Sequence, residues 1–344
     1  MRARRPGRRH PASPPRRAVT RPYHHLPRGF RNPPGSPRES AGLEEYARFF
    51  WRRAREAARP VAVPEGHALA PAEVARGLAA AGASDSLTWL GHAAFLLRVN
   101  GATLLTDPYL TDWAGPVAGL GPRRFVPPAL TPDRLPPLDA VLLSHNHYDH
   151  LDVATLSALP RKERTVAVVP LGLGRLPRSL GFAHVREVDW EESVRVAGVT
   201  VTALPAVHFS SRTPFDRNRT LWAGYAVAGP ASRLYFAGDT AHGPVFADVG
   251  ARHGPFDHAL VPVGAYEPRS IMAAVHTSPE EAVRLGADLR ARTLVAMHWG
   301  TVVLTDEPPF EPRERFLAAG RAAGYADERL WALAVGETRL LTPA

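Results

Sequence analysis

The chain of 344 residues contains no cysteine. It therefore forms no disulfide bond, offers no thiolate to a metal ion and has no thiol nucleophile. This excludes disulfide-stapled scaffolds, cysteine-ligated zinc sites and cysteine-dependent hydrolases. The absence does not indicate a redox compartment, because cysteine-free chains are compatible with all of them. Any metal bound by these side chains needs nitrogen or oxygen ligands.

Long apolar runs are also missing. No stretch approaches the 18 consecutive apolar residues of a membrane-spanning helix. The early arginines resemble the start of a signal peptide, but no apolar segment of seven or more residues follows them. We therefore expect a cytoplasmic protein, with peripheral contact to a membrane surface as a further possibility. Lysine is scarce as well, since Lys162 is the only one, and the Arg, Ala and Pro usage is typical of GC-rich bacterial coding.

Acidic residues are absent from the N-terminal end of the chain. Residues 1–38 contain 11 arginines and neither Asp nor Glu, which leaves 31 basic and 33 acidic residues for the rest. The formal charge of +9 therefore belongs to a Pro/Arg-rich arm, residues 1–37, too polar to be fully ordered. The arm is either a solvated tail or a segment that attracts anionic lipid or nucleic acid. We expect residues 38–344 to form a single domain with a sizeable core.

The densest polar pattern is Ser-His-Asn-His-Tyr-Asp-His-Leu-Asp at residues 144–152. It places three imidazoles and a carboxylate within six residues, and these are ligands that suit zinc and neighbouring divalent ions. The apolar run Ala140–Leu143 directly before it predicts a buried strand, whose end would give a metal site a rigid edge. The alternative, a His-rich surface loop, leaves both the strand and the interleaved Asp unexplained.

Side-chain alternation indicates which of these groups share an ion. In an extended segment His145 and His147 point to the same side, because side chains alternate with a period of two. They are therefore placed to bind one metal together. Asp149 and His150 follow as the chain turns into a helix, and they are placed to reach a second ion.

Three more apolar runs end in a polar group. They end at His208, Asp239 and His298. Each one alone is explained as a hydrogen-bonded core His or a turn Asp. Four such strand ends in one chain, one of them dense with ligands, favour a shared site.

Hydrophobic periodicity predicts alternating strands and helices, an α/β fold in which two sheets face each other with helices outside. The expected strands are Leu87–Trp89, Phe95–Val99, Ala102–Thr106, Ala140–Ser144, Thr165–Val169, Val199–Ala203, Trp222–Val227, Leu234–Ala237, Ala259–Val263, Leu294–Met297 and Thr338–Leu341. The expected helices are Leu43–Ala58, Pro71–Ala81, Val153–Ala158, Val245–Arg252, Pro279–Arg290 and Arg313–Ala323.

The ligand pattern, in this order along the chain, resembles the metallo-β-lactamase superfamily. Several short sequence motifs further resemble one branch of it, the N-acyl-phosphatidylethanolamine-hydrolysing phospholipase D family and its bacterial relatives. These motifs are residues 29–33, 89–93, 106–108, 144–152, 264–269, 276–282 and 298–301. The resemblance implies an αββα sandwich, two facing mixed sheets with helices on the outer faces and the site at one sheet edge. It also implies that Tyr23–Pro33 of the arm packs on the body.

The resemblance implies a site for two divalent ions. One ion would be held by His145, His147 and His208, the other by Asp149, His150 and His298, with Asp239 bridging both. Such ions lie roughly 3.5–4 Å apart and activate a shared water for attack on phosphorus. Zinc is the expected metal, although iron and manganese also accept imidazole and carboxylate ligands.

Other polar residues are given roles by the same resemblance. Asp149 and His276 are the expected catalytic residues. His276 either contacts phosphate or donates a proton, or it merely precedes a helix that begins with Ser278 as its N-cap. Asp107 either orients a metal-bound His or is a turn residue. His92 is expected to be structural or to lie at the edge of the site.

Two long loops flank the predicted ligands. Residues 112–137 hold four apolar side chains that either line a groove for acyl chains or pack on the sandwich edge: Trp113, Val117, Leu120 and Phe125. The loop after His208 holds three arginines, at least one of which we expect to bind phosphate oxygens: Arg212, Arg217 and Arg219.

These patterns predict a metal-dependent hydrolase. The most specific prediction is a phosphodiesterase of phospholipase D type that cleaves N-acyl-phosphatidylethanolamine-like lipids to phosphatidic acid and N-acylethanolamine. Three alternatives are a hydrolase of the same fold acting on a lactone, nucleic acid or small phosphodiester, a nucleic-acid-binding protein acting through its arm, and a metal-binding scaffold without catalysis. An apolar groove beside the ligands would favour the lipid.

Overall fold

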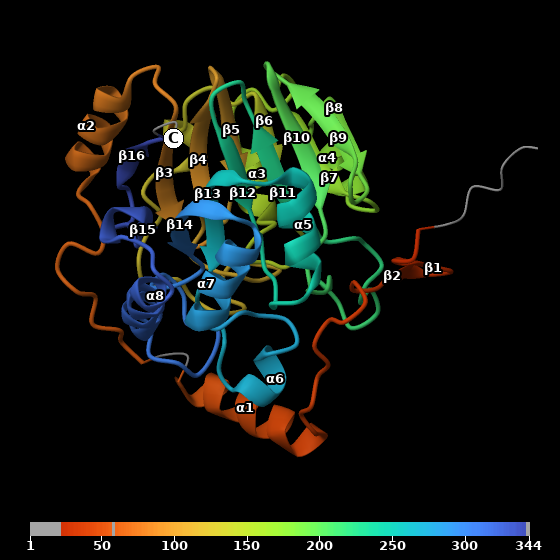
Figure 1. Ribbon diagram of the computed structural model, residues 1–344. Helices are drawn as coiled ribbons and strands as arrows, with labels where there is room; N and C mark the ends of the chain where they lie inside the picture. The colour runs from red at the N-terminus through yellow and green to blue at the C-terminus, as the bar shows by residue number, and fades with distance from the viewer. Residues whose placement is uncertain (1–21, 57–58, 342–344) are drawn as a thin grey trace, which may run out of the picture.

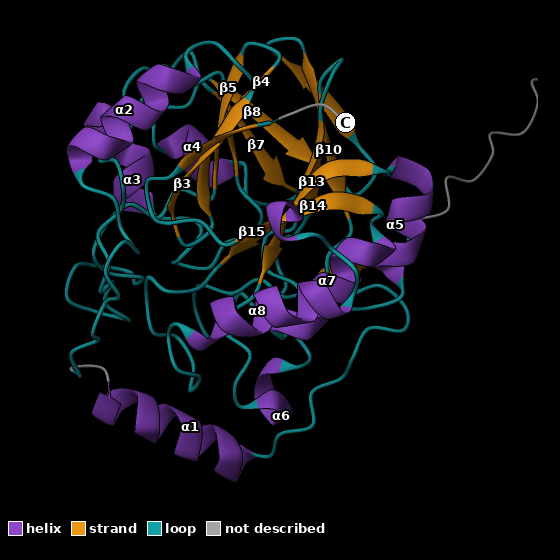
Figure 2. Ribbon diagram, turned by 60° about the vertical axis from the view of Figure 1, so that its left-hand side comes forward, coloured by secondary structure: helices purple, strands orange, loops and turns teal. Residues whose placement is uncertain are grey.

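Two seven-stranded mixed sheets face each other in the computed structural model, which describes residues 22–56 and 59–341 (Figures 1 and 2). The first sheet has the order β16-β3-β4-β5-β6-β7-β8 and the second β15-β14-β13-β12-β11-β10-β9. Helices lie on the outer faces, so the predicted αββα sandwich is confirmed. None of the helices among the described residues is long and apolar enough to cross a membrane.

The strands of the first sheet are β3 (Ser86–Gly91), β4 (Ala94–Val99), β5 (Ala102–Thr106), β6 (Ala140–Leu142), β7 (Val166–Pro170), β8 (His184–Val188) and β16 (Thr338–Leu340). Those of the second are β9 (Ser193–Val196), β10 (Val199–Leu204), β11 (Gly224–Ala228), β12 (Arg233–Phe236), β13 (Phe256–Pro262), β14 (Ala291–Met297) and β15 (Leu330–Trp331). A small hairpin pairs β1 (His25–Leu26) with β2 (Gly29–Phe30). The helices are α1 (Leu43–Glu56), α2 (Pro71–Ala81), α3 (Val153–Ala158), α4 (Arg175–Ser179), α5 (Val245–His253), α6 (Arg269–Met272), α7 (Pro279–Asp288) and α8 (Glu311–Ala322).

Alternating side chains of the central strands of the first sheet enter different cores. On β4, Phe95, Leu97 and Val99 join the large cluster between the two sheets. Their neighbours Ala94 and Leu96 join a second cluster, which packs the outer face of the first sheet. This division follows from the period of two along a strand. Both faces of the strand are buried, and the sheet is therefore a rigid support for whatever lies at its edge.

The strands predicted from the sequence are all present, with ends displaced by at most three residues. Two edge strands were missed, β8 and β9. Each has charged residues interleaved with valine and leaves about half of its side chains outside the core, so its hydrophobic pattern is weak. The short elements β1, β2, β15, α4 and α6 were also missed, because two to five residues are too few to show periodicity.

The described part of the arm packs on the body. His24 and His25 place their Nε2 atoms 2.6 and 2.7 Å from the two carboxylate oxygens of Asp189. The sequence resemblance implied such packing. The domain boundary after residue 37 stays a prediction, and residues 1–21 of the arm lie outside the described residues.

His258 generates a prediction about stability. It is buried on β13, and neither ring nitrogen has a hydrogen-bond partner among the described residues. Burial lowers its pKa to about 4, whereas an unfolded chain takes up this proton near pH 6.5. The contribution of neutral His258 to the free energy of unfolding is therefore complete above about pH 6.5, and it is lost as pH falls toward 4. Between about pH 7 and pH 5, the wild type should lose roughly 1–2 kcal/mol more unfolding free energy than His258→Leu.

Urea unfolding of the wild type and His258→Leu at the two pH values measures this difference. Equal losses in both proteins would show that His258 does not stay neutral in the folded state.

Candidate metal centre

The metal-motif loop, residues 144–152, leaves the end of β6 and runs into α3. Asp152 forms the N-cap of that helix, where its side chain accepts a hydrogen bond from Ala154 N at 3.1 Å. The loop is thus held by a buried strand on one side and a capped helix on the other. Its side chains are positioned by regular structure, as a metal site requires.

The end of β12 approaches this loop so closely that only glycine fits. A Cβ on Gly238 would lie 2.5 Å from Cβ of Ser144, and the backbone there has a φ of 59°. The absence of a side chain at this position lets the next residue, Asp239, reach the centre. His92, Asp107 and His298 also have positive φ values, of 57°, 27° and 64°. Such backbone conformations persist only where the surrounding structure enforces them.

One group of ligand atoms joins the metal-motif loop to the second sheet. His145 Nε2 lies 2.8 Å from His147 Nδ1, which lies 3.3 Å from His208 Nε2. The carboxylate of Asp239 is 3.9 Å from His145 Nε2 and 3.8 Å from His208 Nε2. The ligand atoms of all four residues lie within 4.8 Å of one another. The structure thus brings together three imidazoles that the sequence predicted to share one ion.

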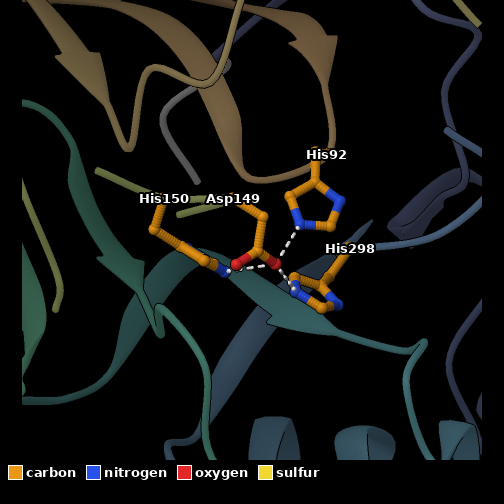
Figure 3. Close-up of side chains that lie close together, drawn as sticks. All are labelled: His92, Asp149, His150 and His298. Carbon is orange, nitrogen blue, oxygen red and sulfur yellow. Dashed lines mark hydrogen bonds and ion pairs between the residues drawn. The ribbon is translucent and has the colours of Figure 1, made fainter. Parts of the chain in front are cut away.

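A second group lies beside the first (Figure 3). Asp149 Oδ2 is 3.5 Å from His150 Nε2 and 3.4 Å from His298 Nε2. These are the three residues predicted for the second ion. His92 Nε2 also lies 2.9 Å from Asp149 Oδ2, so His92 belongs to the centre itself. The sequence suggested at most an edge position for it, because the Trp-Leu-Gly-His motif has no neighbouring ligand to mark it.

Asp239 lies between the two groups. Its Oδ2 is 3.0 Å from His150 Nε2 and its Oδ1 is 3.2 Å from His298 Nε2, while the first group surrounds it on the other side. This is the position that a bridging carboxylate requires. The seven side chains predicted as ligands therefore converge on one buried point.

The donor set fits divalent cations. Three buried ligand atoms have no hydrogen-bond partner among the described residues: His150 Nε2, His298 Nε2 and Asp239 Oδ1. Burial lowers the pKa of His147 to about 3 and that of His208 to about 4, which leaves both imidazoles neutral. A neutral imidazole is the form that binds metal. Nitrogen lone pairs that face one another in a buried site need a cation between them.

The carboxylates make the centre attractive to positive charge. Burial alone would lower the pKa of His298, but the negative charges of Asp239 and Asp149 outweigh it and raise that pKa to about 9. The pKa of His150 is raised for the same reason, again against the effect of burial. The same field that holds a proton on these rings would favour a divalent ion in its place.

Asp107 orients the second group. Its Oδ2 lies 2.7 Å from His150 Nδ1, and its two oxygens accept hydrogen bonds from the backbone N and side-chain Oγ of Ser144 at 2.7 and 2.5 Å. The carboxylate therefore fixes the ring of His150 so that Nε2 faces the centre. Of the two interpretations of Asp107, the structure supports the orienting role.

Asn32 holds the backbone of the candidate ligand His208, a role that the sequence did not indicate. Its Oδ1 accepts hydrogen bonds from the backbone N of His208 and from Trp222 Nε1, both at 3.0 Å. His208 is held further by a 2.8 Å contact between its Nδ1 and the carbonyl of Val275. Asn32 lies within a motif already similar to the family. Its partner is 176 positions away in the chain, and no local pattern marks such a contact.

His276 lies beside the ligands. Its ring centroid is 5.1 Å from that of His208 and 5.5 Å from that of His298, and burial lowers its pKa. It also directly precedes the start of α7, where Ser278 and Glu281 form a capping box. Both interpretations of this residue are therefore compatible with its place, and its catalytic role stays a prediction.

The arginines of the loop after His208 differ in what they contact. Arg212 donates from one guanidinium nitrogen to the carbonyls of Asn146 and Leu151, at 2.8 and 2.7 Å, and stacks on the ring of Tyr148. It braces the metal-motif loop, and this geometry disfavours a phosphate contact. Arg217 is exposed over the ring of Phe209. The prediction of a phosphate contact therefore passes to Arg217 and Arg219.

Arg212 generates a prediction about the stability of the loop. Lysine cannot reproduce a planar guanidinium that bonds two carbonyls and stacks on a ring, so Arg212→Lys should lower the unfolding free energy by about 1–3 kcal/mol. Arg217→Lys, the exposed control, should change it by less than about 0.5 kcal/mol. Urea unfolding of both variants measures the difference, and equal effects would show that Arg212 is not a structural brace.

Residues 102–299 match the β-lactamase superfamily domain. An uncharacterised protein of Mycobacterium tuberculosis is 45% identical over 239 residues, which cover 68% of this chain and 63% of that relative. The N-acyl-phosphatidylethanolamine-hydrolyzing phospholipase D 1 of Caenorhabditis elegans is 39% identical, over 66% of this chain and 67% of the relative. The mitochondrial enzyme of that name in Saccharomyces cerevisiae is 33% identical, over 73% and 55%. The matched region thus spans about two-thirds or less of each relative's length.

Solved structures agree on the fold. An isothiocyanate hydrolase from Delia radicum gut bacteria superposes with a TM-score of 0.60 and 24% identity, over 75% of this chain and all of the other. A metallo hydrolase from Ignicoccus hospitalis superposes with a TM-score of 0.57 and 21% identity, over 76% and 100%. The resemblance seen in the motifs is confirmed: the chain belongs to the β-lactamase superfamily of metal-dependent hydrolases, and its relatives include N-acyl-phosphatidylethanolamine-hydrolysing phospholipases D.

Proposed function

We propose that this protein is a phosphodiesterase of phospholipase D type that hydrolyses N-acyl-phosphatidylethanolamine-like lipids. The observation that carries the proposal is a large, partly apolar groove that shares two lining residues, Val303 and Leu304, with a narrower pocket lined by the candidate ligand His298. A lipid needs such a groove for its acyl chains, whereas a small water-soluble substrate does not. The names of the nematode and yeast relatives support the same substrate class.

The groove has a volume of about 970 Å³ and lies between α1, the loop of residues 112–137 and the chain after β14. It is lined by Phe49, Phe50, Arg53, Ala54, Glu56, Arg59, Pro60, Val61, Trp113, Gly121, Pro122, Arg123, Arg124, Phe125, Val303 and Leu304. Two of the four apolar side chains predicted for an acyl groove, Trp113 and Phe125, are among them. The other two, Val117 and Leu120, are exposed beside it.

Two residues of the groove wall relate it to the candidate centre. Leu304 and Tyr148, a residue of the metal-motif loop, pack against the same small cluster of Tyr109, Ala114 and Val302. Val303 and Leu304 also line a narrower pocket that reaches the ligand His298. A lipid whose acyl chains lie in the groove would therefore have its phosphate close to the metal ligands.

The residues of the centre would have separate roles in hydrolysis. His145, His147 and His208 would hold one divalent cation, Asp149, His150 and His298 the other, and Asp239 would bridge them. Two cations, for which we favour zinc, would supply Lewis-acid stabilisation of the phosphate oxygens and a more acidic water. Asp149 would accept the proton of the attacking water, and His276 would contact the phosphate or protonate the leaving oxygen. Acyl chains bound in the groove would keep bulk water away from these groups.

Incubation of the zinc-loaded protein with N-acyl-phosphatidylethanolamine in mixed micelles tests the proposal. Mass spectrometry should detect phosphatidic acid, and chelation of the metal should abolish it. His147→Ala, which removes a ligand, should lower the rate by at least about 10²-fold. His184→Ala, an exposed histidine on β8, should leave the rate unchanged. Metal-dependent cleavage of a generic phosphodiester without phosphatidic acid from the lipid would discard the lipid assignment.

A second prediction concerns Asp107. An amide at this position offers one acceptor oxygen where the carboxylate offers two. Asp107→Asn therefore cannot accept from both His150 Nδ1, now at Oδ2, and the backbone N of Ser144, now at Oδ1. The affinity for zinc should fall about 10–100-fold, measured by competition with a chromophoric chelator. Asp248→Asn, at an exposed position on α5, is the matched control. Unchanged affinity in Asp107→Asn would remove the orienting role.

A further inference from the structure

Helix α1 turns its apolar residues outward. Five side chains form a continuous stripe along its exposed side, which we call the apolar stripe: Leu43, Ala47, Phe50, Trp51 and Ala54. Leu43 is 91% exposed, Phe50 63% and Trp51 60%. A surface helix of a globular protein normally buries its apolar side and exposes its charges. In α1 the apolar stripe is exposed instead, and it has no partner among the described residues.

The inner side of α1 is tied to the body by polar contacts. Arg52 forms a 2.5 Å ion pair with Asp306, and Arg53 donates to the carbonyl of Thr305 at 2.8 Å. Ser270 donates a hydrogen bond to Glu45, nearer the start of the helix. These bonds fix the rotation of the helix about its axis. The apolar stripe cannot turn toward the body unless they break.

The position of α1 leaves the apolar stripe accessible. Both views show the helix at the outer edge of the molecule, beyond α6 and away from the two sheets (Figures 1 and 2). No other labelled helix or strand lies on its outer side in either view. An apolar surface in such a place marks an interaction site.

The charges beside the apolar stripe identify the partner. Exposed Arg48 and Arg55 flank it, and the guanidinium of Arg55 lies 4.6 Å from the ring centre of Trp51. Arg48 forms a 3.1 Å ion pair with Glu44, the one exposed acidic residue of the helix, so the charge beside the stripe is net positive. Aromatic and apolar side chains next to arginines are typical of helices that lie in the interface of an anionic bilayer.

We propose that α1 docks the protein onto an anionic lipid bilayer, with the apolar stripe inserted at the headgroup boundary. A second copy of the chain is the less favourable occupant. A helix of 14 residues is about 21 Å long and roughly 10 Å wide, so the stripe covers on the order of 200 Å². A stable protein interface buries about 800 Å² per partner.

Docking through α1 would also turn the opening of the groove toward the bilayer that holds the lipid substrate. Phe50 and Ala54 belong to both the apolar stripe and the groove wall, so the groove opens at the surface that would face the bilayer. The exposed Val117 and Leu120 stand in the loop on the opposite wall. This consequence rests on the proposed function, because it assumes a lipid in the groove. The docking itself does not.

Sedimentation with phosphatidylcholine vesicles, with and without phosphatidylglycerol, tests the docking. Neither vesicle contains N-acyl-phosphatidylethanolamine, so binding is measured apart from hydrolysis. The full chain should bind the anionic vesicles and keep part of that binding at high salt. Leu43→Ser/Trp51→Ser should lower the salt-resistant partition coefficient by at least about tenfold. Neither residue lines the groove, so turnover of a water-soluble phosphodiester should be unchanged.

The matched control is Leu340→Ser, which removes an exposed apolar side chain from β16 at the far end of the molecule. It should bind as the wild type does. Binding that salt abolishes completely would assign the contact to the Arg-rich N-terminal residues, and would overturn the proposal. A dimer that dissociates in Leu43→Ser/Trp51→Ser, seen by light scattering, would assign the stripe to a second copy. Vesicle binding without lipid hydrolysis would reject only the proposed function.

Discussion

The buried carboxylate of Asp239 is the constraint around which the centre is built. Nitrogens of four imidazoles lie 3.0–3.9 Å from its oxygens, two from each group of ligands. A buried negative charge is costly unless positive charge compensates it. Protons on His150 and His298 provide that compensation in the absence of metal, and divalent cations would provide more of it. The sandwich supplies the rigidity that this arrangement needs, because the candidate ligands follow β6, β10, β12 and β14, whose last residues are buried.

The fold and the convergence of the candidate ligands were predictable because their signals are local. Apolar runs mark the central strands. The density of imidazoles in residues 144–152, directly after such a run, is poorly explained by a His-rich surface loop. The ends of these strands meet at one edge of the sandwich, where β5 and β6, and likewise β12, β13 and β14, run parallel. A polar residue after each strand is therefore a sound guide to the centre. The edge strand β8 escaped prediction because burial on one side only weakens its pattern.

Long-range contacts were not predictable in the same way. Asn32 holds the backbone of His208, and His92 reaches Asp149, yet neither residue has a ligand near it in sequence. Arg212 was one of three arginines, at least one of which was expected at phosphate, whereas the structure places it on carbonyls of the metal-motif loop. The exposure of the apolar side of α1 could not be predicted from the sequence either. Periodicity shows that a helix has two faces, but only the fold shows which face is covered.

A crystal structure of the zinc-loaded protein, with an anomalous difference map at the zinc edge, tests the central claim most directly. The account predicts two peaks roughly 3.5–4 Å apart, one among His145, His147 and His208 and one among Asp149, His150 and His298, with Asp239 between them. A single peak, or a peak held by His92 with Asp239 unligated, would contradict it.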